Sequence, residues 1–490
     1  ANVFVQKSQQ GGGSPVLRGF EANRICLVID GVRMNNAIYR GGHLQNVLTI
    51  DSWSLDRVEV LQGPASVMYG SDALGGVLHF VTRKPELAKT GQNRDLSSNM
   101  FFRYGSVNQE KTAHAGFNIG FRKFAALTSL TFSSFGDLMM GKNNSFFSDS
   151  TDFGKRPFYV SRVNGKDSVI KNSNPNLQTG SGYNQFNLVQ RFRFQPKPNQ
   201  EHGLNLQVST SSDVPRYDRL TETRNGLPRY AEWYYGPQKR VLLAYDFEHR
   251  NDTVHPTRIL HIGANHQWIE ESRNTRNFRS DNRSVRLERL QVSGFNLDYK
   301  IKDSAHTLRI GGDFQGNVLV STAEKVSVSG NGNSPESTRY PDGTNRFYNS
   351  GVFLSHSWDL HPKITLNEAL RGGFTHLYAT FRDKSFYPFP FSEIKQTNFV
   401  YSGSLGLVYR PVPATKLSAL VSTGFRSPNI DDLAKIFDSA PGTLIVPNPN
   451  LKPEKTLNGE LNFDAQITKA IRWQGAGYYT FLYDAIVTDS

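Results

Sequence analysis

Apolar residues occupy every second position in many short stretches of the chain beyond residue 95. In one stretch Phe186, Leu188 and Phe192 share one face, while Asn187 and Arg191 share the other. A period of two is typical of β-strands that have one apolar face. The same alternation recurs in Val241, Leu243, Tyr245 and Phe247, in Leu417, Ala419, Val421 and Phe425, and in Ile471, Trp473, Tyr479, Phe481 and Tyr483.

This alternation predicts about fifteen strands. We expect them near residues 97–106, 112–121, 126–134, 183–194, 204–211, 240–249, 257–270, 286–301, 306–320, 347–360, 364–381, 398–410, 416–426, 457–469 and 471–487.

The connections between these strands alternate between short and long. The short ones span residues 122–123, 195–203, 302–306, 361–363 and 410–415, and the long ones span about 136–182, 212–238, 271–285, 321–346, 382–397 and 427–456. A soluble sandwich has no reason to sort its loops in this way. Outer-membrane barrels do, because they have tight turns on the periplasmic side and large loops outside. The sorting therefore predicts a transmembrane β-barrel.

The N-terminal part has a different pattern. Residues 55–84 place glycine and proline at sharp breaks between two short apolar runs, which is typical of turns and close backbone approaches in a small compact domain. The breaks are Gly63-Pro64, Gly70, Gly75 and Gly76.

Three N-terminal motifs together carry a resemblance to a known family. VLRGF at residues 16–20, VIDGV at 28–32 and the glycine-rich stretch 55–84 occur in one order. They closely resemble the plug domain of TonB-dependent outer-membrane receptors. The resemblance implies an all-β transmembrane barrel with a small mixed α/β plug inside its lumen, and we expect a plug at residues 1–88 and a barrel at 95–490.

The barrels of this family have twenty-two strands, as large plugged transporters do. About fifteen are predicted here, and an antiparallel single-chain barrel needs an even number. The last strand-like run stops at Ser490 without a terminal aromatic residue, and no signal segment or TonB box is visible near Ala1. We therefore expect the chain to lack the front of the plug and roughly the final seven strands.

Composition excludes only some classes of protein. The chain has 490 residues, its hydrophobic fraction is 37%, and no apolar run is long enough for a spanning helix. The net charge of +13 comes from scattered basic residues without a nucleic-acid motif, so anionic lipid headgroups or acidic ligands are better partners than nucleic acid. The single cysteine, Cys26, lies in an apolar strand and is expected in the core.

The sequence contains no nucleophile elbow, paired-cysteine zinc site, HExxH motif or phosphate-binding glycine loop. We expect no catalytic activity, no cofactor and no resident metal.

A plug inside a wide barrel needs partners for its desolvated charges. The resemblance implies that Arg18 and Arg57 of the plug pair with glutamates of the barrel wall, for which Glu460 and Glu368 are the candidates. The alternative is that these side chains are ordinary solvated charges.

A second resemblance lies near the C-terminus. Residues 424–429, GFRSPN, and 448–451, NPNL, resemble the FRAP and NPNL motifs of haem receptors, which makes Arg426 a candidate ligand contact. Haem receptors have an axial histidine between the two motifs, and this chain has none between Phe425 and Asn448. That absence weakens a haem assignment.

Ligand contacts are expected on the upper loops of the plug and on the inner wall of the barrel. Residues 35–43 offer Tyr39, Arg40 and His43 on a glycine-rich segment. An imidazole suits iron and cobalt, but one histidine without a second ligand favours a hydrogen-bonding role.

Aromatic residues cluster in or beside the long loops and could hold an apolar or planar ligand. The alternative is the aromatic girdle at the membrane interface. The two groups are Trp233, Tyr234 and Tyr235 with Tyr230, and Phe386, Tyr387, Phe389 and Phe391.

The leading hypothesis is TonB-dependent active uptake of an iron siderophore, haem or a cobalamin-like chelate. The resemblance implies a monomer in the bacterial outer membrane, in contact with lipid and lipopolysaccharide and energised by TonB, ExbB and ExbD. The alternatives are a passive porin or surface adhesin, and a glycan importer that works with a lipoprotein lid.

Overall fold

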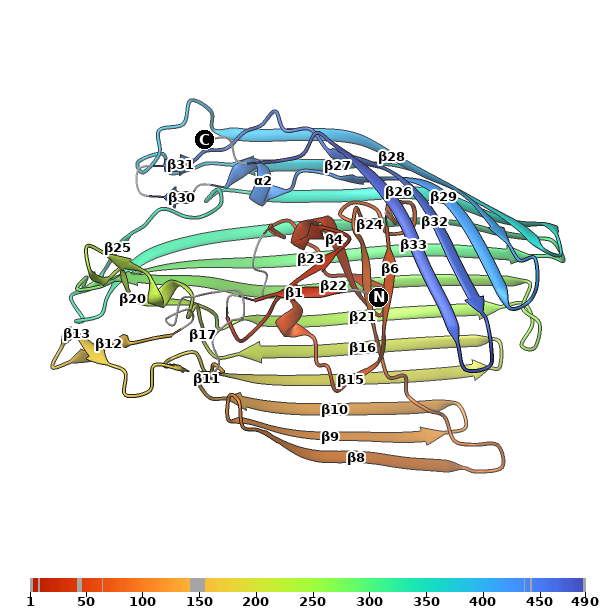
Figure 1. The fold of residues 1–490 in the computed structure, drawn as a ribbon, viewed down its shortest axis with the longest axis horizontal. Helices are drawn as coiled ribbons and strands as arrows, with labels where there is room; N and C mark the ends of the chain where they lie inside the picture. The colour runs from red at the N-terminus through yellow and green to blue at the C-terminus, as the bar shows by residue number, and fades with distance from the viewer. Residues whose placement is uncertain are drawn as a thin grey trace.

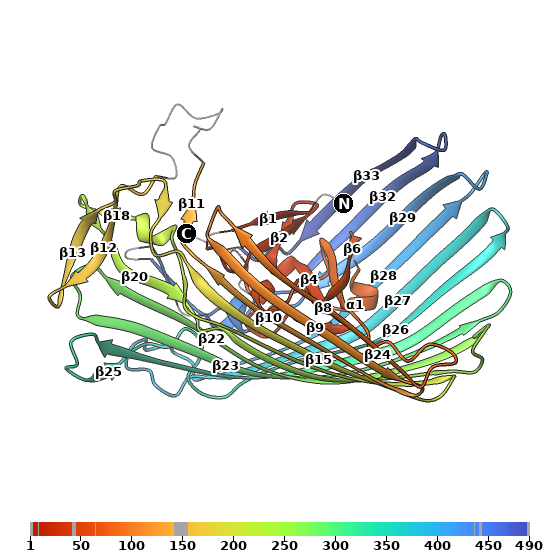
Figure 2. The same cartoon turned by 90° about the horizontal axis from the view of Figure 1, so that it is seen from below.

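The computed structural model describes residues 3–7, 9–41, 46–63, 65–141, 155–435, 437–440 and 443–487. They form a large antiparallel sheet curved into a barrel and a small N-terminal plug that lies within its curve (Figures 1 and 2). The predicted fold class is confirmed. None of the helices in the described residues has the length and hydropathy needed to cross a bilayer.

Eighteen strands of the described residues form the barrel, and in the strand order β33 is followed by β8, which closes the sheet. Three of them, β17, β20 and β25, are short, and each of the other fifteen matches a predicted strand. The strands are β8 (Arg94–Gly105), β9 (Glu110–Phe121), β10 (Phe124–Phe135), β15 (Tyr183–Lys197), β16 (Gln200–Ser211), β17 (Val214–Pro215), β20 (Tyr230–Tyr235), β21 (Lys239–Arg250), β22 (Arg258–Asn277), β23 (Asn282–Lys302), β24 (His306–Ser327), β25 (Asn333–Pro335), β26 (Asn345–His361), β27 (Ile364–Thr380), β28 (Glu393–Tyr409), β29 (Thr415–Arg426), β32 (Glu454–Gln466) and β33 (Arg472–Tyr483).

The barrel wall is apolar outside and polar inside. Phe399 is 86% exposed on the outer face, whereas Asn317 is fully buried on the inner face. In β15, the outward Phe186 and Phe192 are exposed while the inward Asn187 and Arg191 are buried, as the alternation predicts. A soluble protein buries its large apolar side chains and exposes its amides. This wall does the opposite, which fits a surface that faces lipid.

Long and short connections lie on opposite sides of the barrel, and the long ones carry extra strands and turns (Figure 1). One predicted loop is wrong. Residues 271–285 form a hairpin in which β22 and β23 remain paired as far as Thr275 and Ser284. The polar side chains there suggested a loop, but they also fit strands that continue beyond the membrane. The loop elements are β11 (Leu138–Met139), β12 (Phe158–Val163), β13 (Lys166–Lys171), β14 (Leu177–Gln178), a 3-10 turn (Arg219–Thr221), β18 (Thr223–Arg224), β19 (Leu227–Pro228), α2 (Ile430–Ala434), β30 (Phe437–Ala440) and β31 (Thr443–Ile445).

The plug contains a four-stranded sheet in the order β5-β4-β7-β6, in which β4 and β7 are parallel. A smaller sheet of β1, β2 and β3 lies beside it. The plug elements are β1 (Phe4–Gln6), β2 (Ser14–Leu17), β3 (Phe20–Glu21), a 3-10 turn (Ala22–Arg24), β4 (Ile25–Ile29), β5 (Val32–Arg33), a second 3-10 turn (Asn46–Thr49), β6 (Leu55–Gln62), α1 (Ser66–Tyr69) and β7 (Gly76–Thr82).

The two faces of β4 pack differently. Leu27 belongs to an apolar cluster that also contains Leu242 and Ala244 of the barrel wall. On the other face, Cys26 and Val28 belong to a small cluster of plug residues only. The predicted burial of Cys26 is confirmed.

Glycine is required where β7 begins. A Cβ atom on Gly76 would lie 2.2 Å from the backbone oxygen of Leu61, and the φ angle of Gly76 is 145°. Both conditions exclude a side chain. The predicted close approach in the glycine-rich stretch is therefore present.

Candidate functional site

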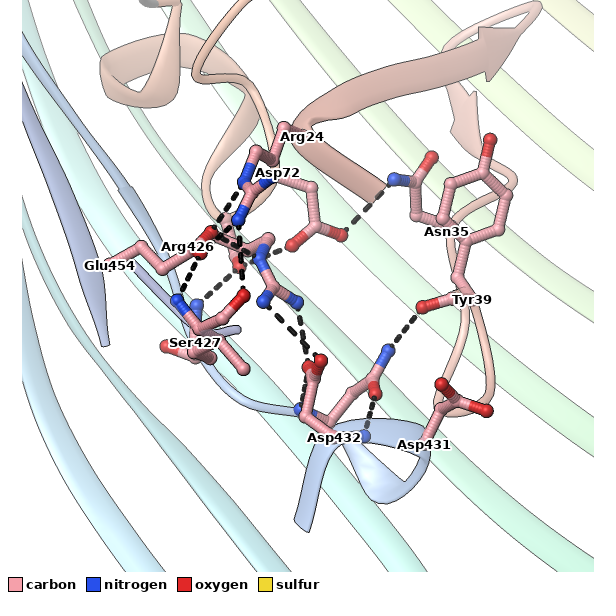
Figure 3. A network of polar contacts seen from close by, with 12 residues as sticks. Arg24, Asn35, Tyr39, Asp72, Arg426, Ser427, Asp431, Asp432 and Glu454 are labelled. Atoms are coloured by element: carbon pink, nitrogen blue, oxygen red, sulfur yellow. Dashed lines mark hydrogen bonds and ion pairs between the residues drawn. The ribbon is translucent and has the colours of Figure 1, made fainter. Parts of the chain in front are cut away.

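The end of β29 and the residue that follows it form hydrogen bonds with the plug. The amide of Phe425 donates to Ser66 Oγ at 3.2 Å, and its carbonyl accepts from the amide of Asp72 at 3.1 Å. The amide of Ser427 then donates to Ser71 Oγ at 3.0 Å. These bonds join the predicted GFRSPN motif directly to the α1 segment of the plug (Figure 3).

Helix α2 follows this contact and covers the tip of the plug. Asn429 caps the helix together with Asp432 in a reciprocal capping box. The Nδ2 of Asn429 also donates to the carbonyl of Tyr39 at 2.6 Å, and the amide of Ile430 donates to the carbonyl of Ala37 at 2.9 Å (Figure 3). A shared apolar cluster contains Ala37 and Ile430. The loop after β29 therefore closes over the plug.

A buried ionic network lies beneath this closure (Figure 3). Arg426 donates from Nε to Glu454 Oε2 at 2.6 Å and from Nη1 to Asp432 Oδ2 at 2.6 Å. Arg24 of the plug donates to the other oxygen of Glu454 at 2.6 Å. The Arg426 side chain is 2% exposed. Charges this deeply buried need full pairing, and here each arginine is paired with carboxylate.

Asp431 forms a second ionic contact on α2. It accepts hydrogen bonds from Tyr340 Oη at 2.7 Å, Arg339 Nη2 at 3.2 Å and Lys435 Nζ at 2.8 Å. Burial alone would raise the pKa of Asp431, but Lys435, Arg339 and the nearby Arg40 outweigh it and hold the pKa well below its usual range. The carboxylate is therefore charged at neutral pH, and it ties α2 to the loop between β25 and β26.

Asn429→Ala is expected to loosen α2. The variant loses the helix cap and the bond to the Tyr39 carbonyl, and capping losses cost about 1–2 kcal/mol. Hydrogen exchange at the amides of Ile430 and Leu433 measures this as faster opening. Asn448→Ala is the matched control, since Asn448 is exposed in the same loop and, among the described residues, its side chain bonds the amide of Asn450 alone. Equal acceleration in both variants would contradict the role of Asn429.

Three further contacts fix the plug to the wall. Arg18 forms a bidentate pair with Glu460, with Nη2 donating to Oε1 at 3.0 Å, and its guanidinium lies 4.2 Å from the centroid of the Tyr478 ring. Asp30 accepts from Asn205 Nδ2 at 2.9 Å, and its Oδ1 lies 3.5 Å from Arg191 Nη1. A third contact joins Asp51 to the wall, where it accepts from Thr131 Oγ1 at 2.8 Å.

The structure does not bring the other predicted pair together. Arg57 is 55% exposed and binds Asp56 and Glu59, its neighbours on the same strand. Glu368 is 48% exposed and lies on the outer face of β27, 3.9 Å from His356 Nδ1. Period-two alternation explains this, because Glu368 shares its face with Leu366 and Leu370. In this structure neither Arg57 nor Glu368 bridges the plug and the barrel, and both fit the alternative of solvated charges.

The candidate ligand residues near the plug tip are covered. Tyr39 is 1% exposed and Arg40 is buried with its Nη1 3.3 Å from Glu271. Arg426 is engaged in the ionic network, so its predicted contact with a ligand is not available in this conformation. His43 lies outside the described residues. Tyr39 is buried because α2 covers this segment.

The aromatic group on β20 lies among arginines. Trp233 and Tyr235 are buried, and the Arg216 guanidinium lies 4.8 Å from the Trp233 ring centroid. Arg216 also donates to Tyr235 Oη at 2.9 Å. Tyr234 is partly buried, with the guanidinium of Arg283 5.9 Å from its ring centroid. Burial excludes Trp233 and Tyr235 from a lipid-facing girdle, and their ligand role stays a prediction.

The second aromatic group packs over the tip of the plug. Tyr387, Phe389 and Phe391 lie against the apolar cluster that contains Ala37 and Ile38, and Phe386 is exposed. These side chains extend the cover that α2 places on the plug.

Four important residues were missed by the sequence argument. Arg24 and Glu454 pair across the plug–barrel boundary, Asp30 binds the wall, and Asn429 caps α2. Asp30 and Asn429 lie within the VIDGV and GFRSPN motifs, so the motifs point to the segments but not to these two side chains. Nothing in the local pattern marks Arg24 or Glu454.

Comparison with known proteins gives two family matches. The model for the TonB-dependent receptor plug domain matches residues 1–77, and the model for the TonB dependent receptor-like beta-barrel matches residues 163–490.

Individual proteins give the same picture. The chain is 24% identical over 473 residues to the vitamin B12 transporter BtuB of Vibrio vulnificus, a match that covers 94% of this chain and 60% of BtuB. It is 33% identical over 84 residues to the ferrioxamine receptor of Yersinia enterocolitica, covering 17% and 11% of the two chains. The solved copper transporter OprC superposes with a TM-score of 0.76 at 16% identity, covering 98% of this chain and 67% of OprC. The chain thus spans less than two thirds of the curated relatives that it matches.

Proposed function

Because the chain belongs to the TonB-dependent receptor family, we propose that it serves in active uptake of a scarce ligand across the bacterial outer membrane. The ligand is an iron siderophore, haem or a cobalamin-like chelate, each too large for an ordinary porin. TonB, with ExbB and ExbD, supplies the energy. The observation that carries this proposal is the plug fixed inside the barrel and closed on top by α2.

The closed plug explains why uptake needs external energy. Passage requires breaking buried ion pairs such as Arg18–Glu460 and Arg24–Glu454. Separating one buried charge from its partner costs about 3–5 kcal/mol. A ligand shifts the plug only by its difference in affinity for the two plug states, so release into the periplasm needs a force from elsewhere.

The ligand classes are not equally supported. Haem is the least favoured, since the chain has no histidine between the GFRSPN and NPNL motifs and Arg426 is already paired. A siderophore or a cobalamin-like chelate fits the curated relatives better. A passive porin predicts an open lumen and a steady single-channel current, which the closed plug opposes. No observation favours the lidded glycan importer.

Uptake measurements test the proposal. Cells that lack the gene are compared with cells that carry it in full length, using radioactive ferrioxamine, haem and cyanocobalamin as probes. We expect uptake of one probe to be lost in the deletion strain, restored by the gene, and not restored in cells that also lack TonB. Unchanged uptake of all three probes would remove these ligands, and restoration without TonB would remove the energy-coupled mechanism.

A further inference from the structure

A cavity of about 300 Å³ lies beside β25, at the side of the barrel where the long loops gather (Figure 1). Its lining comes from the end of β24 at residues 321–323 and from two segments, 335–342 and 381–389. Asp383 and Phe386 of this lining are exposed, so the cavity reaches the protein surface. It shares no residue with the ionic network around Arg426.

Aromatic rings form one part of the lining. The rings of Phe381 and Phe389 have centroids 5.5 Å apart and planes inclined by 59°, and Tyr387 stacks on Phe389 at 5.9 Å. Phe386 adds a fourth ring. The face of an aromatic ring attracts a cation that lies within about 6 Å of its centroid. Inclined rings can therefore contact one cation on more than one side.

Carboxylates form another part of the lining, and two of them have no basic partner. Asp342 accepts from the amide of Arg382 at 2.8 Å and from the amide of Asp383 at 2.9 Å. Asp383 accepts from the amide of Ser385 at 2.8 Å, and hydrogen bonds from Ser385 hold the pKa of Asp383 below its usual range. Among the described residues, these two carboxylates bind no lysine or arginine side chain. Asp383 is therefore charged at neutral pH and open to a cation.

Glu336 is the third carboxylate, and its pairing is loose. Its side chain is 11% exposed, and the nearest basic atoms, Arg286 Nη2 and Lys325 Nζ, each lie 3.8 Å from it. Arg286 makes a shorter bond of 3.0 Å to the carbonyl of Ser337. In the described part of the chain, the cavity lining contains three carboxylates and neither lysine nor arginine.

Ser321 contributes a neutral polar group to the same lining. It is 3% exposed, and its Oγ has no hydrogen-bond partner among the described residues. A buried hydroxyl without a partner is uncommon in folded proteins. The cavity is also small, since its volume lies at the lower limit of the roughly 300–1,000 Å³ typical of ligand sites. It therefore suits one small polar group rather than a whole chelate.

We propose that this cavity binds a substituted ammonium group of an organic cation. Aromatic rings attract the cation through their faces, and the carboxylates neutralise its charge. A hard metal ion fits less well, because Ca²⁺ takes about six to eight oxygen ligands and the described residues contain no cluster of three metal-binding side chains. The site goes beyond the uptake function proposed above. Only one consequence, that the cargo has a cationic end, rests on that function.

The experiment compares choline with 3,3-dimethylbutan-1-ol, which has the same shape but no charge. Each is titrated into the purified full-length protein in a non-ionic detergent, and calorimetry gives the dissociation constant. We expect choline to bind roughly tenfold or more tightly than the neutral alcohol. Asp383→Asn and Phe386→Leu should each weaken choline binding by roughly threefold or more and change binding of the alcohol much less. Both residues are exposed, so neither substitution opens the core.

Glu393→Gln is the matched control, because Glu393 is an exposed carboxylate near the same loops but outside the lining. Its choline affinity should equal that of the native protein. Three results would overturn the inference: equal affinity for choline and the alcohol, equal weakening by Glu393→Gln and Asp383→Asn, or displacement of choline by one equivalent of Ca²⁺. None of these measurements needs TonB or a proton gradient, so a failure of this site leaves the uptake function standing.

Discussion

Arg426→Ala is expected to release the GFRSPN segment from the plug. The substitution leaves Glu454 and Asp432 buried with one partner fewer, and removing one partner of a buried ion pair costs about 3–5 kcal/mol. The free energy of local opening is measured by native-state hydrogen exchange at the amides of Phe425 and Ser427, which donate to Ser66 and Ser71 of the plug. The exchange rates of both amides should rise by the factor that corresponds to this loss of about 3–5 kcal/mol.

Two further variants serve as controls for Arg426→Ala. Arg57→Ala removes an equally charged side chain whose partners are exposed neighbours on the same strand, so the same amides should be unchanged. Arg426→Lys should recover only part of the loss, because an ammonium group cannot reproduce the planar fork that meets both carboxylates. An effect of Arg57→Ala as large as that of Arg426→Ala would show that general charge, rather than the buried network, stabilises the closure.

Gly76→Ala is expected to damage the plug sheet itself. The new methyl group would meet the backbone oxygen of Leu61 at 2.2 Å, and Gly76 has a φ angle of 145°. Overpacking against backbone together with strained φ costs about 3 kcal/mol or more. The measurement is hydrogen exchange across β7, supported by protease resistance of the plug in the purified protein.

The control for this variant is another glycine with positive φ. Gly31 has a φ angle of 81°, but a Cβ atom there would meet no atom within 4 Å. Gly31→Ala should therefore cost only the left-handed backbone conformation, about 1–2 kcal/mol. Equal losses in the two variants would mean that the close approach of β7 to β6 is not the limiting constraint.

The sequence predicts most of this fold because its signals are local. Alternation with a period of two places the fifteen long strands, and the glycine positions mark the tight packing of the plug. The error at residues 271–285 has a simple cause. Polar residues outside the membrane look alike in loops and in extended hairpins, so alternation ceases to separate them.

The candidate site was harder to predict, for two physical reasons. Arg24 and Glu454 lie 430 residues apart in sequence, and only the folded arrangement of plug and barrel brings them together. The burial of Tyr39 depends on α2 folding inward, which no residue near Tyr39 indicates. The position of Glu368 was predictable, since Leu366 and Leu370 place it on the outer face.

The contacts between α2 and the plug tip have a consequence for how the tip can vary in sequence. The amide of Ile430 and the side chain of Asn429 bind the carbonyl oxygens of Ala37 and Tyr39, which every amino acid supplies. The side chains are constrained separately, because both residues are buried and Ala37 packs in the cluster that contains Ile430. The main-chain bonds therefore tolerate any residue at these two positions, whereas the packing beneath α2 tolerates only side chains of similar volume.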